Sequence, residues 1–563
     1  MQKHLITIAC VFVLLFQGGF DDSIWSLAGM AAAAFLILKA KKRPLAPIVL
    51  LLLSMALVYC VAMFYHGLTF EALAAVNRVV VAFLILMVFY NMEADVDNTI
   101  IITGMVAAGI GLAAFSGIFH WDGAVSARRL QSTFQYANTA GLFFAVAAFI
   151  AYRHDKKRPY AFVFETAMLL TQSVGAIAVY IIGWVVFAVI KRSKVSCFIC
   201  SFMLALVSAA LVFGAVYVIQ IPPLGILPPL IVFVVWKKYP QLFAAVAQKK
   251  FILWIGAGLL PAVGAVLIMT RGLRPIATYI ERIIQSMDGI NIMRRYPFGL
   301  GPGGWPFYFT QYQSAPYDVS IIHNGYVGMG VDAGFLVIIP VLVLLVYWFK
   351  HQKWGRSSVC VVMILLQAFM DIPFSFLIIV IVLAMLAAKG VPETWPMPAY
   401  MRLAFIVPVA LCALVFSTAV ISNRAAWLAN NGQFEAAVHM LDNRLIHRDT
   451  DAILTQMQLF LLLGDHANVE QAYLSLPRRN ARAYFIRAAS YLDNEAPYEA
   501  MALAMSGITL APHSSQGFLL AARIMPYLSA DMQLVYHNKM EVYAEDTYVN
   551  PLFIYITRIL EGG

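Results

Sequence analysis

The chain has 563 residues, of which 62% are hydrophobic and only 12% charged, and its mean hydropathy is +0.79. This composition supplies too little polar surface to cover a soluble globule, so it predicts a polytopic membrane protein. The net charge of +10 does not require a nucleic-acid partner, because many Lys and Arg residues lie in short loops between apolar runs, where they set membrane orientation.

Apolar runs long enough to cross a bilayer recur over the first 422 residues and predict about 12 to 15 transmembrane helices. The run at 160–190 is too long for one crossing and has basic loops on both sides, so it is predicted to cross twice with a reversal near residues 172–175. The predicted spans are 5–18, 23–39, 46–64, 72–91, 99–118, 136–152, 160–190, 195–219, 223–236, 251–270, 325–348, 357–371, 373–388 and 403–422.

Basic loops mark the cytoplasmic side of a membrane protein. Assigning the basic loops of this chain to that side places residues 271–324 and everything after Ser422 outside. Chemistry outside the membrane has no supply of ATP or nucleotide sugars, so an activated substrate would have to arrive on a carrier such as a lipid. The loops assigned to the inside are 39–43, 153–158, 191–194, 237–250, 350–356 and 389–402.

The composition changes at Asn423, where membrane-length apolar runs stop. Residues 427–437 and 489–512 look like tetratricopeptide helix hairpins, and residues 459–464 are consistent with a further degenerate repeat. The sequence therefore predicts a membrane domain at 1–422 and an extracytoplasmic α-helical repeat domain at 423–563. We expect the repeat domain to bind or position a partner molecule, and a protein is one candidate.

The longest polar interruption of the membrane domain runs from Glu281 to Asp332, within a predicted large extracytoplasmic loop at 271–324. Loops of this length usually carry function or are disordered, and the many aromatic residues favour function. His323 lies at the mouth of the next predicted span, which starts near Gly325. There it could cap a helix or, since histidine titrates near neutrality, transfer a proton or contact phosphate. Arg282 lies on a helix-like stretch and could be a snorkelling anchor or a phosphate ligand.

Other residues of the polar segments also have two interpretations, one structural and one functional. Arg294 and Arg295 are either solvated loop residues or anion ligands. Residues 299–304 are rich in glycine, but no strand precedes them, so we expect a tight turn that permits close backbone approach rather than a nucleotide site. In the stretch 128–138, Asn138 is a plausible N-cap of the next span and Arg129 a further phosphate contact.

Three of these segments, taken together, resemble the O-antigen ligase family, a set of outer-face glycosyltransferases with a membrane-embedded fold of the C type. Residues 129–138 are similar to the family's Arg-x-x-Gly-Thr-Phe-x-x-Pro-Asn segment, with Ser132 and Ala137 as departures. Arg282 stands fifteen residues before Pro297, like the family's Arg ahead of its Pro-x-x-Gly-x-Gly turn. The stretch 323–334 is similar to the family's His-Asn followed by Glu-x-Gly, with aspartate at position 332.

The resemblance has one clear departure. Family members carry Ser-Arg-Gly at the outer turn of a membrane hairpin, and that Arg is thought to hold the donor diphosphate. Here the turn is Thr171-Gln-Ser-Val-Gly175. Either another arginine takes the place of the missing one at Val174, or the donor differs, or activity is lost. The arginines available as replacements are Arg128, Arg129, Arg271 and Arg274.

The resemblance implies transfer of a glycan from a polyprenyl diphosphate, such as undecaprenyl diphosphate, to an acceptor hydroxyl on a glycan, protein or wall polymer. The setting would be the outer face of a bacterial cytoplasmic membrane. Arg282 and His323 would be catalytic, and no cofactor or metal ion is expected because no cluster of carboxylates and histidines suggests ligation. Residues expected to bind the donor diphosphate or glycan are Arg128, Arg129, Asn138, Arg295, Asn324 and Tyr326.

Three alternatives remain open at the level of sequence. A repeat-unit polymerase differs from a ligase only in its acceptor. A flippase or transporter would use charged groups within spans, for which Arg78, Glu165 and Asp371 are candidates. A non-catalytic scaffold would recruit other enzymes through the repeats.

Overall fold

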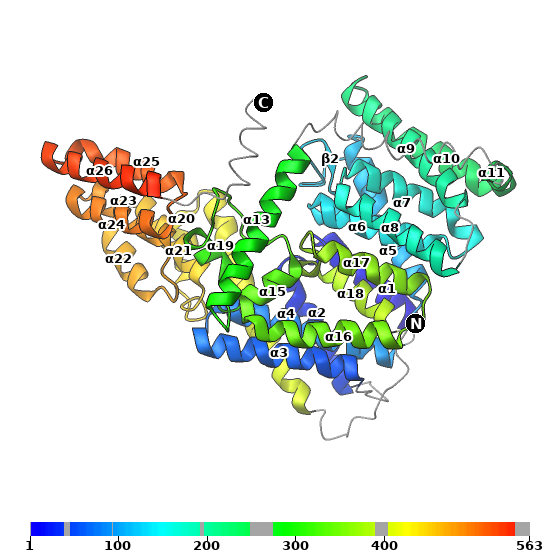
Figure 1. The fold of residues 1–563 in the computed structure, drawn as a ribbon, viewed down its shortest axis with the longest axis horizontal. Helices are drawn as coiled ribbons and strands as arrows, with labels where there is room; N and C mark the ends of the chain where they lie inside the picture. Colours follow the sequence, from blue (N-terminus) through cyan, green and yellow to red (C-terminus); the bar gives the residue numbers. More distant parts are fainter. Residues whose placement is uncertain are drawn as a thin grey trace. The chain divides into compact units, whose positions relative to one another are not determined.

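The computed structural model describes residues 2–38, 46–92, 94–191, 196–247, 274–388 and 403–546. Helices make up nearly all of the regular structure in these ranges (Figure 1). The single sheet among them is a two-residue antiparallel ladder of β1 (Val125–Ser126) and β2 (Arg129–Leu130), with Val125 opposite Leu130. The predicted all-α class is therefore confirmed for the described part of the chain.

The chain folds into two compact units that are discontinuous in sequence. Unit 1 consists of Met1–Leu52, Val81–Ile276 and Val343–Phe405, and unit 2 consists of Leu53–Val80, Ala277–Leu342 and Ile406–Gly563. The division predicted at 422/423 rests on composition and stays a prediction.

Helix α6 lies in the core of unit 1 and is rich in Ala and Phe. Small residues let neighbouring helices approach closely: a Cβ at Gly141 would lie 2.8 Å from Thr171 Oγ1. Helices of this unit are α1 (Gln2–Leu15), α2 (Asp22–Leu38), α5 (Val96–Phe115), α6 (Ala137–Ala151), α7 (Arg158–Leu170), α8 (Val174–Lys191), α9 (Ser196–Tyr217), α10 (Leu227–Lys238), α11 (Pro240–Ala247), α17 (Arg356–Ala368) and α18 (Leu377–Ala388). Three more, α3 (Pro47–His66), α4 (Phe70–Asn91) and α16 (Ile338–His351), contribute residues to both units, and the first three residues of α13 (Arg274–Arg295) belong to unit 1.

The apolar run at 160–190 is divided into two helices, as predicted. Helix α7 ends at Leu170 and α8 begins at Val174. Between them Gln172 has a φ of 51°, and the hydroxyl of Thr171 accepts a hydrogen bond from the Ser173 amide at 3.2 Å. A left-handed residue cannot continue a helix, so the break is local in origin.

Unit 2 contains the polar segment and the C-terminal helices. The first part comprises α13 (Arg274–Arg295), α14 (Trp305–Tyr308) and α15 (Gly325–Ala333). The second comprises α19 (Ile406–Asn430), α20 (Phe434–Leu441), α21 (Thr450–Leu462), α22 (His466–Ser475), α23 (Ala481–Asp493), α24 (Pro497–Leu510), α25 (Ser515–Ile524) and α26 (Ala530–Asp546).

Neighbouring C-terminal helices pack in pairs, α19 with α20, α21 with α22 and α23 with α24. Short turns at 431–433, 463–465 and 494–496 join the members of each pair, and each turn contains a residue with positive φ: Gly432, Gly464 and Glu495. Helix α21 begins with an aspartate cap, because Asp449 accepts a hydrogen bond from the Ala452 amide. Tetratricopeptide identity for these pairs stays a prediction.

The helix-like stretch predicted around Arg282 is the 22-residue helix α13. Two local expectations were wrong. The predicted single span at 325–348 is broken after Ala333, because Gly334 has a φ of 78° and any Cβ there would meet the Pro297 carbonyl oxygen at 1.7 Å. Asn138 is not an N-cap: α6 begins at Ala137, so Asn138 lies in the first turn and binds other side chains.

Six described helices are long and apolar enough to cross a membrane, and further apolar helices of 10–17 residues accompany them. They fit the predicted multi-pass membrane protein. The predicted span at 251–270 and the basic residues 39–43, 192–194 and 389–402 lie outside the described residues. The six long helices are Pro47–His66, Phe70–Asn91, Val96–Phe115, Val174–Lys191, Ser196–Tyr217 and Leu403–Asn430.

Candidate functional site

The buried face of α13 in unit 2 carries polar side chains. Gln285 and Asp288 are only 1% and 3% exposed, and they alternate with the buried Ile284 and Ile292. Positions three and four apart share one face of a helix, so these groups all point toward the same neighbours. Burying polar side chains is unfavourable unless they are hydrogen-bonded, which predicts specific partners for both.

Gln285 holds His323. The amide oxygen of Gln285 accepts hydrogen bonds from the His323 backbone amide at 3.4 Å and from its Nδ1 at 3.2 Å. The amide nitrogen of Gln285 donates to Glu281 at 3.0 Å. Because the acceptor faces Nδ1, that nitrogen carries the proton of the neutral imidazole, and the basic lone pair is on Nε2. In the neutral ring Nε2 is therefore the nitrogen that can accept a proton.

Arg282 occupies the same stretch of α13, one turn before Gln285. It is half-buried, and its carbonyl accepts a hydrogen bond from Ser286 Oγ at 2.8 Å. Burial raises the pKa of Glu281 above its usual value, while the Gln285 hydrogen bond and the positive charge of Arg282 lower it. The structure thus brings the imidazole of His323 to the segment of α13 that carries Arg282.

Two other predicted residues follow His323 directly. Asn324 is the N-cap of α15: its side-chain oxygen accepts hydrogen bonds from the amides of Tyr326 at 3.2 Å and Val327 at 3.1 Å. This cap fixes where α15 begins and so fixes the residue before it. Tyr326 is half-buried in the first turn.

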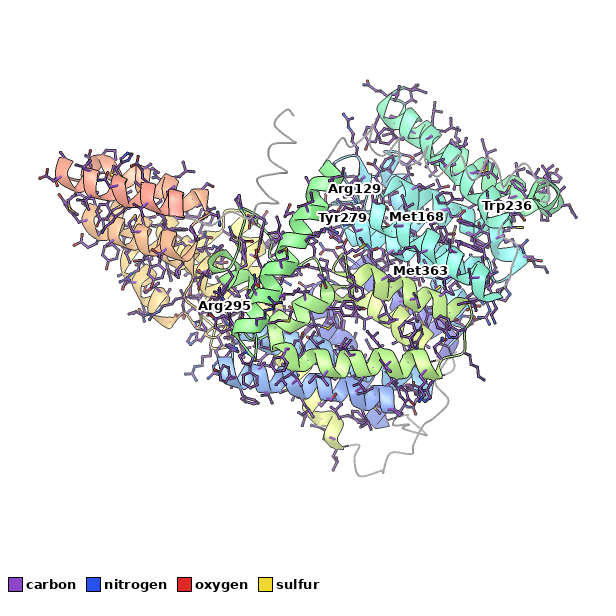
Figure 2. All side chains as sticks on the ribbon, viewed as in Figure 1. Arg129, Met168, Trp236, Tyr279, Arg295 and Met363 are labelled. Carbon is purple, nitrogen blue, oxygen red and sulfur yellow. The ribbon has the colours of Figure 1, made fainter. Side chains whose placement is uncertain are left out.

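Arg295 is not part of this arrangement. It is exposed at the C-terminal end of α13, ten residues beyond Gln285, or about 15 Å along a helix that rises 1.5 Å per residue. Figure 2 labels Arg295 at one end of α13 and Tyr279, which is close to Arg282 in sequence, toward the other. Arg295 is therefore separated from His323 within the same unit.

Asp288 anchors the chain that leads to His323. Its carboxylate accepts hydrogen bonds from the Ser314 amide at 2.9 Å, the Ser314 hydroxyl at 2.7 Å and the Tyr317 hydroxyl at 2.9 Å. Burial raises the pKa of Asp288, and the three donors oppose that shift. Sequence reasoning did not single out Asp288, whose signal is an acidic residue at the spacing of a buried helix face.

The glycine-rich turn approaches α15 closely, as predicted. Gly299 has a φ of 68°, and a Cβ there would lie 2.1 Å from the carbonyl oxygen of Val331. That carbonyl accepts a hydrogen bond from the Leu300 amide at 2.7 Å. The Gly303 amide donates to Asp332 at 3.0 Å, so Asp332 holds the turn.

The C-terminal helices also hold the polar segment. Arg478 is 3% exposed and donates a hydrogen bond to the Pro302 carbonyl at 3.3 Å. Thr310 donates to the Leu510 carbonyl at 3.1 Å, and Phe307 lies in a core cluster with Met457 of α21. The aromatic residues therefore order the segment, as predicted, and they do so by packing against residues that sequence reasoning assigned to a separate domain.

The remaining predicted residues lie in unit 1. Arg129 donates from Nε to the Thr171 carbonyl at 2.8 Å and from a terminal nitrogen to the Asn138 side-chain oxygen at 2.8 Å. Its guanidinium thus lies at the α7–α8 turn that contains Val174. Arg128 is exposed and lies 5.6 Å from the centroid of the Tyr217 ring.

The other two arginines considered for that turn, Arg271 and the side chain of Arg274, lie outside the described residues.

Glu165 and Asp371, two of the charged residues that a transporter could use, have hydrogen-bond partners nearby. Glu165 accepts hydrogen bonds from Tyr152 at 3.0 Å, from Tyr180 at 2.6 Å and from Ser201. Asp371 accepts one from Tyr136 and one from its neighbouring amide, Ile372, at 2.9 Å. Such contacts stabilise buried carboxyl groups within helix bundles.

The fold and the polar segment define an all-α protein with several apolar helices of membrane-spanning length and an ordered site of arginine, glutamine and histidine on α13 and before α15. Comparison with protein-family models found no match for the chain, and comparison with curated proteins found none either. Within the described residues, no group of three or more His, Cys, Asp or Glu side chains is arranged to hold a metal ion.

Proposed function

We propose that the protein transfers a glycan from a polyprenyl diphosphate to an acceptor hydroxyl at the outer face of a bacterial cytoplasmic membrane. The observation that carries the proposal is the pair of hydrogen bonds from His323 to Gln285, which directs the imidazole to the stretch of α13 bearing Arg282. An imidazole to accept a proton and a guanidinium to bind phosphate are the two groups that such a transfer needs.

The reaction breaks the bond between the anomeric carbon of the donor and its diphosphate oxygen, and it forms a bond from the acceptor oxygen to the same carbon. The acceptor hydroxyl loses its proton to Nε2 of His323, acting as general base. Negative charge develops on the departing diphosphate, and Arg282 stabilises it through charge-assisted hydrogen bonds. Asn324 fixes the start of α15 and thereby the position of His323.

The arrangement in unit 1 offers a donor contact that the sequence alone left open. Arg129 brings its guanidinium to the turn where related enzymes are expected to carry arginine in place of Val174. A guanidinium stays charged at all accessible pH values and suits the planar recognition of phosphate. Within unit 1, Arg129 rather than Arg128 is therefore our candidate for the guanidinium that the resemblance expects at this turn.

The direct test is transfer from a lipid-linked glycan by purified full-length variants. We expect Arg282→Gln to lower kcat by about 10²- to 10³-fold, as for loss of one preorganised donor, and Arg282→Lys to lower it less. His323→Gln should lose a comparable factor. Arg294→Gln, an exposed arginine near the end of the same helix, is the matched control and should retain activity.

Undiminished transfer in both Arg282→Gln and His323→Gln refutes the proposal. Analysis of the product separates the two kinds of acceptor: longer lipid-linked chains indicate a polymerase, whereas glycan on a protein, lipid core or wall polymer indicates a ligase. Movement of the lipid-linked glycan across vesicles without any transfer indicates a flippase and also refutes it.

A further inference from the structure

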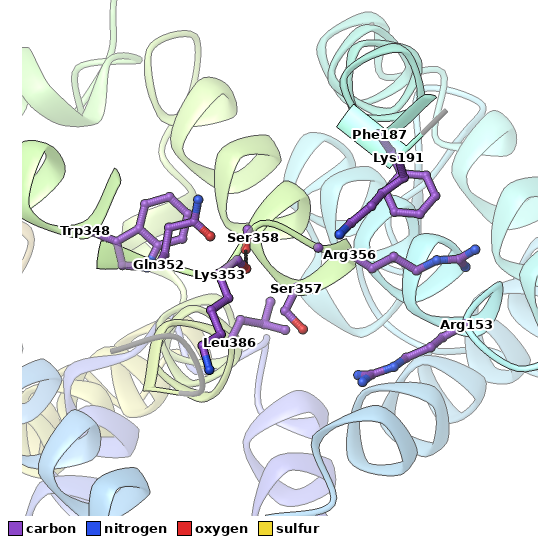
Figure 3. Close-up of a pocket in the computed structure, with 11 residues that line it drawn as sticks. Arg153, Phe187, Lys191, Trp348, Gln352, Lys353, Arg356, Ser357, Ser358 and Leu386 are labelled. Carbon is purple, nitrogen blue, oxygen red and sulfur yellow. Dashed lines mark hydrogen bonds between the residues drawn. The ribbon is translucent and has the colours of Figure 1, made fainter. Parts of the chain in front are cut away.

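A cavity of about 560 Å³ opens among helix ends of unit 1 (Figure 3), and its lining includes none of the residues assigned to transfer. Its volume is in the range of ordinary small-molecule sites. The walls come from the ends of α8, α16 and α18, the start of α17, and the segments that follow α6 and α16. The lining residues are Arg153, Phe187, Lys191, Trp348, Gln352, Lys353, Gly355, Arg356, Ser357, Ser358 and Leu386.

The cavity is strongly basic. Four lining side chains are cationic, Arg153, Lys191, Lys353 and Arg356, and none of the described lining residues is acidic. Asp97 offsets only the first of them, through an ion pair of 3.1 Å. Gathering like charges around a concave surface of low dielectric focuses a positive potential that attracts anions.

Three lining side chains have buried polar atoms that lack a hydrogen-bond partner in the described part of the chain. Gln352 is 7% exposed and both of its amide atoms are unpaired. Trp348 is 3% exposed with an unpaired Nε1, and one terminal nitrogen of Arg356 is unpaired as well. Buried polar groups in folded proteins are almost always satisfied, so these three side chains favour a polar ligand as their partner.

The backbone at the start of α17 also favours an anion in the cavity. Helix α17 begins at the cavity, with Gly355 as an N-cap that offers no side-chain acceptor. Its first-turn amides, from Arg356 to Ser358, point out of the helix start, where unpaired N–H groups and the helix dipole favour an anion. The guanidinium of Arg356 lies 4.9 Å from the centroid of the Phe187 ring, which holds it in place.

We propose that this cavity binds an anionic, phosphate-bearing headgroup. Arg356 and Gln352 donate hydrogen bonds to phosphate oxygens, Lys191 and Lys353 supply charge, and Trp348 donates from its indole nitrogen. The basic loops that border the cavity are the ones that the sequence predicts to be cytoplasmic, which favours a lipid of the inner leaflet over a soluble phosphate ester. The site does not depend on the transfer reaction proposed above.

The test is a thermal-unfolding titration of the full-length protein, purified in detergent, with three probes. Short-chain phosphatidylglycerol carries the proposed headgroup on a lipid, glycerol phosphate carries it in soluble form, and short-chain phosphatidylcholine is a lipid of zero net charge. Stabilisation by phosphatidylglycerol alone identifies a lipid site, and stabilisation by glycerol phosphate identifies a site for soluble esters. Either result supports the phosphate chemistry, whereas equal responses to the two lipids with none to glycerol phosphate overturn it.

Variants make the test specific. Arg356→Gln should weaken binding about tenfold or more, as expected for a lost hydrogen bond to a charged group. Lys156→Gln removes an exposed charge outside the cavity and should leave affinity unchanged.

Gln352→Leu separates a ligand contact from an incidental buried amide. It should raise the unfolding midpoint of the ligand-free protein, because the unpaired amide is gone, and should weaken binding as well. Unchanged affinity in Gln352→Leu overturns the proposal, even where Arg356→Gln fails to fold because it loses its contact with Phe187.

Discussion

Replacing Gln285 by methionine tests whether the contact that orients His323 serves catalysis. Methionine has a similar length and helix propensity, but its thioether is only a weak acceptor and cannot donate. The change removes the two hydrogen bonds at 3.4 and 3.2 Å to His323 and the one at 3.0 Å to Glu281. The backbone of α13 is expected to stay as it is.

The size of the effect follows from the burial of these groups. Gln285 itself is 1% exposed, but His323 and Glu281 are half-buried and can regain water. Each orphaned group costs about 1 to 3 kcal/mol when fully buried, and partial access to water favours the low end, so we expect a loss of about 2 to 3 kcal/mol in stability. Because the imidazole is no longer held in one tautomer and orientation, kcat should fall by about 10- to 100-fold, with KM little changed.

The assay measures kcat and KM for transfer from a lipid-linked glycan, together with the midpoint of thermal unfolding. Gln285→Glu is the conservative variant: its carboxylate still accepts from Nδ1 of His323, but it also faces Glu281, so it should recover only part of the lost rate. Ser286→Ala removes only the hydrogen bond to the Arg282 carbonyl and should behave as wild type. Full kcat in Gln285→Met, or no recovery in a folded Gln285→Glu protein, refutes the positioning role.

Two further predictions concern stability. Burial raises the pKa of Asp449 from 3.8 to about 7. Between these pH values the folded state therefore binds more protons than the unfolded state. The free energy of unfolding should fall by about 4 kcal/mol as pH rises from 4 to 7 and then level off. Asp449→Asn keeps the helix cap and should remove this part of the slope in thermal unfolding; an identical slope contradicts the assignment. Gly299→Ala should destabilise by more than about 1 to 2 kcal/mol, the cost of a left-handed alanine, since its Cβ also meets the Val331 carbonyl. Gly328→Ala, which has open space in the middle of α15, should be neutral or stabilising in the same assay, and equal losses in both would contradict the close approach.

Local properties of the sequence were enough to predict most helices. Apolar runs, flanking basic loops and turn residues located α1 to α9 to within a few residues, including the break between α7 and α8. The aromatic residues of the polar segment correctly predicted that it is ordered. These features depend on hydrophobic burial and backbone preference, which neighbouring residues largely determine.

Contacts between distant residues were decided only by the tertiary structure. The break at Gly334 arises because the Pro297 carbonyl occupies the space that a side chain would need, and no feature near Gly334 in sequence shows this. Arg478 and Phe307 join the polar segment to helices more than a hundred residues away. Complementary shape and hydrogen-bonding potential, rather than local propensity, select such contacts.

The sequence by itself determined that this protein is helical and apolar, and it named His323 and Arg282 as residues of interest. The tertiary structure decided that Gln285 orients His323, that Arg295 lies apart from it, and that Arg129 reaches the turn at Val174. A single sequence records which side chains are present and which of them share a face of a helix, but which neighbour each face meets depends on how the helices pack.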